Sequence, residues 1–202
     1  MLGMCGSTEV LPPPAPFNFE LRMALTATVY NLDTELADID RSVYETLAIR
    51  MARQPSETAE YMLARYLAYC LEYTEGIAFT EGVAAGGDLP AVMISDLTGQ
   101  VTGWIEVGMP AADRVHRGMK KAGRVAIYTH RTVSQVLAQL SGQSIHRAAE
   151  IPVFEFGAGF IEEVAATIDR RAKVSVSVTE RQLYLDIDGQ TFTTSISEHH
   201  FA

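Results

Sequence analysis

The sequence predicts a mixed α/β fold. Both ends of the patterned region alternate apolar and polar residues, as strands with one buried face do, and the centre alternates strand-like with helix-like periods. The 202 residues are 48% hydrophobic and 20% charged, which is ordinary for a globular protein. A chain of this length buries a sizeable core. We therefore expect one mixed sheet with extra antiparallel strands at its N- and C-terminal ends.

The first 22 residues differ from the rest of the chain. They contain prolines that prevent helix formation and sheet pairing and favour an extended segment, namely Pro12, Pro13, Pro14 and Pro16. Regular patterning begins at Met23. We therefore predict a disordered extension over residues 1–22 and a single folded domain over residues 23–202.

The N-terminal part of the domain has the period of β-strands. Alternating residues predict strands over residues 24–30, 34–39 and 44–52. Asn31 and Asp33 are turn-forming residues, and we expect a turn between the first two strands.

A helix is predicted after Pro55. Ser56 is suited to the N-cap, and Glu57 and Glu60 would lie in the first turn, where negative charge is favourable. Apolar residues then recur at helical spacing, so one face should pack in the core: Ala59, Met62, Leu63, Tyr66, Leu67, Cys70 and Leu71.

The remaining elements follow from the same patterns. Residues 81–90 are glycine-rich and predict a loop. Strands are expected over residues 92–94, 101–107, 125–128, 151–156, 173–178, 182–187 and 191–196. Helices are expected over residues 111–122, 133–140 and 160–168. Asp188 and Gly189 favour a tight hairpin turn between the last two strands.

Composition narrows the functional classes. The net charge of −9 argues against broad non-specific binding of nucleic acid, although a local basic patch could still bind phosphate. The two cysteines, Cys5 and Cys70, provide neither a disulfide framework nor metal-ligand spacing. The sequence lacks an apolar run of membrane-spanning length and a secretory signal, so we expect a cytoplasmic protein without membrane contact.

Two acids lie at the ends of neighbouring predicted strands. Asp96 follows the strand over residues 92–94, and Glu106 lies near the end of the strand over residues 101–107. If the strand that ends at Glu106 folds back past Asp96, the two carboxylates could hold Mg²⁺, which prefers hard oxygen ligands. One ion bound by both requires the carboxylates to lie within about 7 Å of each other. Glu57 or Glu60 could add a third carboxylate if the first helix packs beside these strands. The alternative is that these acids are solvated surface groups or, for Glu57, a favourable helix-dipole charge.

The predicted helix over residues 111–122 carries a basic face. Arg114, Arg117 and Lys121 recur at spacings of three and four, and the chain has no acid between Arg114 and Arg131. Such a face suits phosphate oxygens, which makes these residues and Arg124 candidate nucleic-acid contacts. The alternative is a solvated face that serves solubility.

Trp104 lies two residues before Glu106 on the same predicted strand. Because side chains alternate between the two faces of a strand, these two should share a face. Trp104 could act as a packing wall or as a stacking surface for a base. Motifs of serine hydrolases, zinc proteases, P-loop proteins and dinucleotide-binding folds are absent from the sequence.

Several long blocks of the chain resemble one family. They are MALTATVY from Met23, LADIDRSVY from Leu36, RQPSETAEYMLARYLAY from Arg53, DLTG from Asp96, WIEVGMP from Trp104 and VAIYTH from Val125. In this order they are similar to the YaeQ family, from Met23 to about Ile187. The resemblance implies an α/β protein related to the PD-(D/E)XK, restriction-endonuclease-like superfamily.

In that superfamily one acid begins a central strand, and an acid–any residue–lysine triplet lies in the next. Asp96 matches the first acid and Glu106 the second, but Gly108 occupies the lysine position. The resemblance also implies that the lysine sometimes moves to a neighbouring helix, where this chain has Arg117. Lys120 or Lys121 could compensate, although their angular positions on the helix differ.

Three functions remain open. The first is Mg²⁺-dependent hydrolysis of a phosphodiester in nucleic acid, with Asp96 and Glu106 as ligands, Glu57 in support, and Arg117, Lys120 or Lys121 positioning water or phosphate. The second is a member that keeps the fold, has lost the catalytic lysine and binds nucleic acid or a protein. The third is a structural or regulatory interaction protein that needs neither metal nor phosphate.

Overall fold

The computed structural model describes residues 26–80 and 89–201 of the chain. The predicted extension over residues 1–22 and most of the predicted loop over residues 81–90 lie outside this part. The expected mixed α/β class is confirmed, because helices alternate with the strands of one sheet that contains parallel and antiparallel pairs. Among the described residues, no helix combines the length and hydropathy that crossing a membrane requires.

The sheet has ten strands in the order β2-β1-β8-β9-β10-β7-β6-β5-β4-β3. Its strands are β1 (Thr28–Asp38), β2 (Val43–Arg53), β3 (Ile77–Phe79), β4 (Val92–Ser95), β5 (Val101–Val107), β6 (Arg124–Thr129), β7 (Val153–Phe156), β8 (Arg171–Thr179), β9 (Gln182–Ile187) and β10 (Gln190–His199). The pairs β1–β8, β5–β6 and β6–β7 are parallel, and the other pairs are antiparallel.

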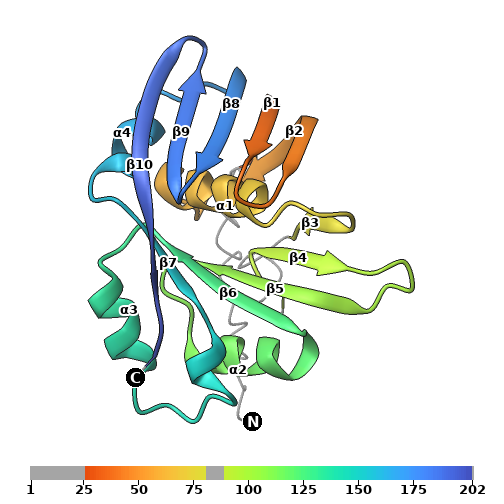
Figure 1. Cartoon of the computed structure of the whole chain (residues 1–202), viewed down its shortest axis with the longest axis vertical. Coiled ribbons are helices and arrows are strands. Elements are labelled where there is room, and N and C mark those ends of the chain that lie inside the picture. Colours follow the sequence, from red (N-terminus) through yellow and green to blue (C-terminus); the bar gives the residue numbers. More distant parts are fainter. Residues whose placement is uncertain (1–25, 81–88, 202) are drawn as a thin grey trace, which may run out of the picture.

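Strand β10 joins the two halves of this sheet. Its residues 190–195 pair with β9, and its residues 196–199 pair with β7. The sheet bends strongly between these halves, so that the strands from β2 to β9 face the strands from β3 to β7 across the interior of the molecule (Figure 1).

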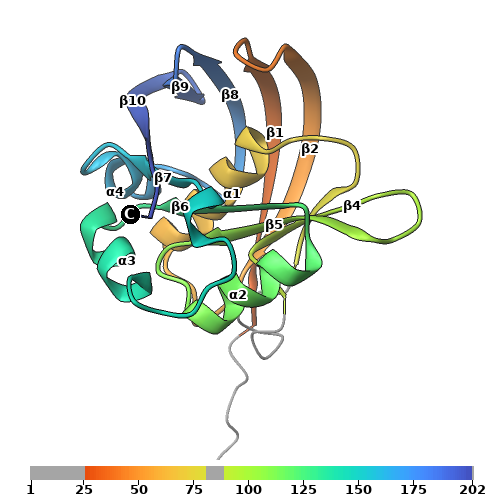
Figure 2. The ribbon, with the colours of Figure 1, turned by 60° about the horizontal axis from the view of Figure 1, so that its bottom comes forward.

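Helix α1 (Ala59–Leu71) lies between the two halves of the sheet (Figures 1 and 2). Its side chains form one core with residues of β1, β8, β9, β5 and β6. Helices α2 (Ala112–Lys121) and α3 (Val133–Leu140) cover the opposite face of β5 and β6, where they form a second core with Trp104. The 3₁₀ helix η2 (Ala148–Glu150) precedes β7, and α4 (Phe160–Ala165) packs on α1 and β10.

The structure corrects the predicted N-terminal meander. Residues 28–38 form one continuous strand, and the turn lies over residues 39–42 instead. Asn31 and Asp33 do not interrupt the strand because their side chains point to solvent, while Leu32 and Leu36 on the alternate positions are buried. The alternation therefore runs unbroken through two residues that also occur in turns.

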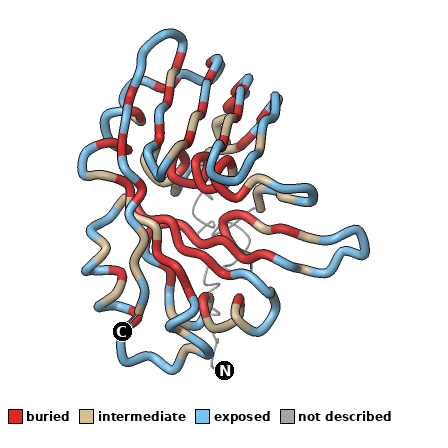
Figure 3. Tube along the Cα trace, viewed as in Figure 1, coloured by how far each residue is buried: buried red, intermediate tan, exposed pale blue. Residues whose placement is uncertain are grey.

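The start of α1 also differs from the prediction. Thr58, and not Ser56, is the N-cap, since its Oγ1 accepts a hydrogen bond from the backbone N–H of Tyr61 at 3.2 Å. Glu60 lies in the first turn as expected. Glu57 precedes the helix and pairs with Arg65. Most of the apolar face predicted for α1 is confirmed: Met62, Leu63, Tyr66, Leu67 and Cys70 are fully inaccessible to solvent, and Leu71 is 8% exposed. Ala59 is only partly buried, and Ala64 and Ala68, outside the predicted face, are buried as well. Figure 3 shows this helix as a largely buried segment between the two halves of the sheet.

We expect Leu63→Ala to lower the free energy of unfolding by about 3 kcal/mol, because Leu63 is 0% exposed and its loss leaves a cavity between the two halves of the sheet. Leu97→Ala is the matched control: Leu97, in the β4–β5 turn, is 93% exposed, and we expect a change below about 0.5 kcal/mol. Urea unfolding followed by circular dichroism measures both. Equal effects would contradict the central position of α1.

Candidate functional site

A cavity of about 490 Å³ lies where β5 and β6 end. The two strands are parallel, so the segments that follow them emerge at the same edge of the sheet. The starts of α1 and α2 complete the wall. The cavity, named here the Glu106 cavity, is lined by Ser56, Glu57, Thr58, Tyr61, Glu106, Val107, Gly108, Met109, Pro110, Ala111, Arg114, His130 and Arg131.

Glu106 is the buried acid of this cavity, with 1% of its surface exposed. Trp104 Nε1 donates to its Oε1 at 2.8 Å, which confirms that these two side chains share a face of β5. Arg114 holds both oxygens, with Nε 3.2 Å from Oε1 and Nη2 3.0 Å from Oε2. Burial raises the pKa of Glu106, and the hydrogen bonds from Arg114 oppose this shift.

Gly108 occupies the expected lysine position two residues after Glu106. Its φ of +77° is a left-handed conformation, which costs any other residue about 1 kcal/mol or more. Its N–H donates to the carbonyl of Tyr128 at 2.8 Å, so this conformation joins the end of β5 to β6. A lysine here would have space but would strain the backbone.

Glu57 lines the same cavity as Glu106. Its Oε2 accepts hydrogen bonds from Arg65 Nη2 at 3.1 Å and from the backbone N–H of Gln54 at 3.0 Å. Its side chain is 5% exposed. Two of the three predicted carboxylate ligands therefore reach one cavity, and each is already paired with an arginine.

The structure does not bring Asp96 to Glu106. Ile105, next to Glu106, pairs with Val92, four residues before Asp96, so the two acids lie at opposite ends of the β4–β5 hairpin. At about 3.3 Å per residue they are roughly 15 Å apart, which corrects the expectation that they bind one ion. Asp96 instead organises the turn, where its Oδ1 accepts from Thr98 N, Thr98 Oγ1 and Gln100 N. These bonds lower the pKa of Asp96.

The basic side chains of α2 are divided by the fold. Only Arg114 reaches the Glu106 cavity. Arg117 forms an ion pair with Asp113 at 3.7 Å, and the Lys121 ammonium lies 5.9 Å from the centre of the Trp104 ring. Lys120 is exposed near the end of the helix and is not among the residues that line the cavity.

Arg124 lies away from this basic face. Its Nε and Nη2 each donate to Glu72 at 2.6 Å, and Tyr128 Oη donates to Glu72 Oε1 at 2.8 Å. Glu72 is the C-cap of α1, so Arg124 ties the end of that helix to the start of β6.

Sequence reasoning missed three residues of the cavity: Tyr61, His130 and Arg131. His130 and Arg131 directly follow β6, and the parallel arrangement of β5 and β6 would have indicated them. Burial lowers the pKa of His130, and the nearby Arg131 lowers it further. Burial raises the pKa of Tyr61 to about 12, with Glu106 adding to the shift.

Two helices begin at this wall. Thr58 caps α1, and Pro110 and Ala111 precede the first turn of α2, for which no side chain acts as a cap. The first amide groups of a helix have no partner within the helix and carry partial positive charge. Together with Arg131 they favour an anion in the cavity. Glu60, which interacts electrostatically with His130 and Arg131, offsets part of this charge.

As arranged, the carboxylates do not fit a magnesium ion. The described residues contain no group of three or more His, Cys, Asp or Glu side chains placed to hold a metal. Both oxygens of Glu106 accept from Arg114, and Glu57 accepts from Arg65. A cation would have to displace these arginines.

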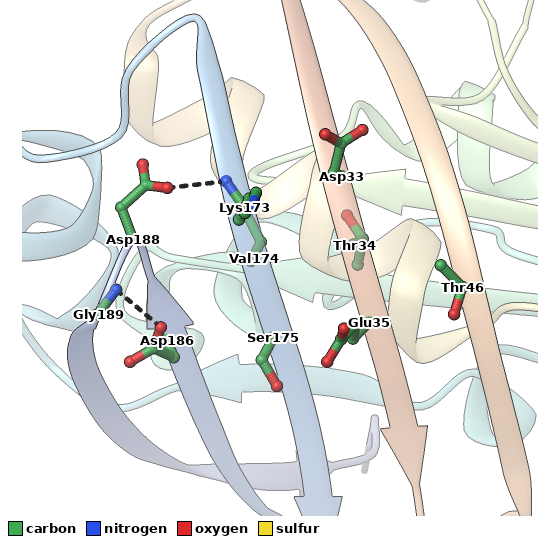
Figure 4. A pocket seen from close by; sticks show the side chains of 10 residues that line it. All are labelled: Asp33, Thr34, Glu35, Thr46, Lys173, Val174, Ser175, Asp186, Asp188 and Gly189. Carbon is green, nitrogen blue, oxygen red and sulfur yellow. Dashed lines mark hydrogen bonds between the residues drawn. The ribbon is translucent and has the colours of Figure 1, made fainter.

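A second cavity, of about 570 Å³, lies on the outer face of β1, β8 and β9 (Figure 4). Its acids include Asp186 and Asp188, which serve the turn between β9 and β10. Asp188 accepts from the backbone N–H of Lys173 at 3.0 Å, and Asp186 accepts from that of Gly189 at 2.9 Å. The hairpin turn predicted at Asp188 and Gly189 is confirmed, since both residues have positive φ.

The chain is similar to proteins of one family. The family model described as "YaeQ protein" matches residues 23–196. The "Uncharacterized protein YaeQ" of Escherichia coli (strain K12) is 28% identical over 176 residues, covering 87% of this chain and 97% of that protein. Its counterpart from Salmonella typhi is 29% identical over 164 residues, covering 81% and 90%.

Two solved structures similar to this chain are also YaeQ proteins. The crystal structure of YaeQ protein from Pseudomonas syringae is 28% identical, covers 85% of this chain and 95% of its own, and superposes with a TM-score of 0.77. The structure of YaeQ protein from Xanthomonas axonopodis pv. citri has a TM-score of 0.78 with coverage of 88% and 100%. At 23% identity the latter bears on the fold alone.

The raised pKa of Glu106 has a consequence for stability. The folded protein holds the Glu106 proton more tightly than the unfolded chain, so the stability this group contributes is present below its ordinary pKa of 4.5. That contribution is lost as the pH rises through the folded pKa. We therefore expect the stability advantage of wild type over Glu106→Gln to shrink as the pH rises from about 4 to 7. Urea unfolding across this range measures it, and a growing advantage would contradict the burial argument.

Proposed function

The chain belongs to the YaeQ family, and we propose that it binds the phosphate backbone of nucleic acid at the Glu106 cavity without hydrolysing it. The observation that carries this proposal is the convergence of two helix starts with Arg131 and His130 on one cavity. A helix start is suited to phosphate because its amide groups donate hydrogen bonds and its dipole favours negative charge.

Arg131 is the cation that this proposal assigns to phosphate. Its side chain is exposed at the cavity, whereas Arg65 and Arg114 are occupied by Glu57 and Glu106. Next to it, Nδ1 of His130 is buried and has no hydrogen-bond partner among the described residues.

Three features favour binding over hydrolysis. Arg114 holds Glu106 through both carboxylate oxygens, and an arginine stays protonated, so it neither frees the acid for a metal nor transfers a proton readily. Gly108 takes the place of the lysine. Asp96 is engaged at the far end of the hairpin.

A relation to the PD-(D/E)XK superfamily is part of this proposal. It is supported by the acid at the end of a central strand and by the helix beside it that presents a basic residue to that acid. The chain would then be a relative in which the ion pair between Glu106 and Arg114 replaces the binding of a metal by the acid. In that case Arg131 and the two helix starts at this cavity would still bind phosphate.

We expect Arg131→Gln to weaken binding of a fluorescein-labelled single-stranded oligonucleotide about tenfold at low salt, because a charge-assisted contact to phosphate is lost. The slope of log affinity against log salt should fall by about one, the change expected for one phosphate contact. Fluorescence anisotropy measures both. The control is Arg171→Gln, an exposed arginine on β8 outside the cavity.

Equal weakening by Arg131→Gln and Arg171→Gln would show that only overall charge matters and would contradict the proposal. Incubation with oligonucleotide and Mg²⁺ or Mn²⁺ tests hydrolysis separately. Cleavage by wild type that Glu106→Gln abolishes would overturn the non-hydrolytic part, and only its loss in Asp96→Asn as well would restore the nuclease hypothesis in which both acids bind the metal.

A further inference from the structure

A separate cavity of about 570 Å³ lies at the junction of the two halves of the sheet. Its wall combines the β1–β2 turn, the β8–β9 turn, the end of α1 and the starts of β6 and β7. Ligand cavities occur preferentially where structural units meet in this way. We name it the arginine cavity because Arg41, Arg124 and Arg181 all line it.

Each arginine of this cavity is held by an acid that is more buried than itself. The pairs are Arg41 with Asp38 at 2.6 Å, Arg124 with Glu72 at 2.6 Å and Arg181 with Glu198 at 2.5 Å. The arginine side chains are 35%, 48% and 60% exposed, and their acids are 4%, 6% and 23% exposed.

These less exposed acids therefore orient the guanidinium groups and leave part of each group exposed. Arg124 uses Nε and Nη2 on Glu72, and Arg181 uses Nη2 on Glu198. A guanidinium carries five N–H donors, so both retain donors for a ligand after these pairs are made. Donors held in place before binding lose little entropy when an anion arrives.

Apolar side chains form another part of the wall. Leu71, Ile94, Pro152, Phe154, Val178 and Ile196 line the cavity beside the arginines. Phe154 stacks on Tyr128, with ring centres 4.8 Å apart, which makes a rigid aromatic surface. The cavity therefore sets an apolar surface beside three arginines and four acids, namely Asp38, Asp40, Glu72 and Glu198. All four acids already accept hydrogen bonds or form ion pairs within the protein. The volume is in the range of small-molecule sites.

The β8–β9 turn adds an independent observation. Glu180 and Arg181 both have positive φ, at +49° and +60°, in a turn where asparagine and glycine are the usual residues. Asp40 stabilises this conformation by accepting from both backbone N–H groups, at 2.7 and 2.9 Å. The backbone of Arg181 thus has an unfavourable conformation that the β1–β2 turn stabilises through Asp40. Backbone strain of this kind is often found at functional positions.

We propose that the arginine cavity binds a small organic anion, with a phosphate or carboxylate head on Arg124 and Arg181 and an apolar body against Phe154 and Ile196. This site is distinct from the Glu106 cavity, with which it shares no lining residue. The ligand is defined by an anionic head on a ring-sized apolar body, because the wall offers both surfaces side by side.

Isothermal titration calorimetry with phenyl phosphate and with benzoate tests the site and distinguishes the two kinds of head group. We expect at least one probe to bind wild type, and Arg181→Gln to weaken that binding about tenfold through the loss of a charge-assisted contact. Arg181 is 60% exposed, so this variant should keep the thermal stability of wild type.

Arg171→Gln is the matched control, because it removes an exposed arginine elsewhere and should bind the probe as wild type does. Repeating the titration in Arg131→Gln separates this cavity from the phosphate site proposed at the Glu106 cavity, and Arg181→Gln should still weaken binding in that background. The proposal is overturned if neither probe binds wild type, if Arg181→Gln leaves binding unchanged in either background, or if Arg171→Gln weakens it to the same extent.

Discussion

The burial of α1 between the two halves of the sheet is the constraint on which the rest of the structure depends. Its residues from Met62 to Ala68 are inaccessible to solvent apart from traces at Arg65, so the sheet has to bend around it. A helix of 13 residues is about 20 Å long. Its N-terminal end lines the Glu106 cavity and its C-terminal end lines the arginine cavity. One buried helix thus positions both candidate sites.

Buried acids in this protein are consistently paired with arginines. Glu57 pairs with Arg65, Glu72 with Arg124 and Glu106 with Arg114, and each acid has less than 10% of its side chain exposed. An isolated carboxylate would be costly at such positions because the interior solvates charge poorly. Arginine suits this role since its fork of donors can satisfy both carboxylate oxygens at once. The same pairing that stabilises these acids opposes their use as metal ligands.

The proposed functions differ in how much they draw on the family relationship. Binding of a phosphate backbone depends on where β5, β6, α1 and α2 meet, and solved YaeQ structures share this fold. The arginine cavity depends on the turn at Glu180 and Arg181, whose positive φ values are stabilised by Asp40. Gly108 shows how one residue limits the reactions that this cavity can catalyse. Its left-handed backbone allows its N–H to bond to β6, and the same conformation would strain a lysine at this position.

The sequence by itself determined the fold class, the inward face of α1 and the hairpin at Asp188 and Gly189, because these follow from local periodicity or local residue chemistry. The family followed from blocks of sequence that resemble its members. It also identified Glu57, Glu106 and Arg114, but not their partners. Only the tertiary structure decided which charges meet. The register of β4 and β5 separated Asp96 from Glu106, and the parallel ends of β5 and β6 brought His130 and Arg131 to the cavity. Strand register and helix packing act between residues far apart in the chain, and spacing along the sequence carries no record of them.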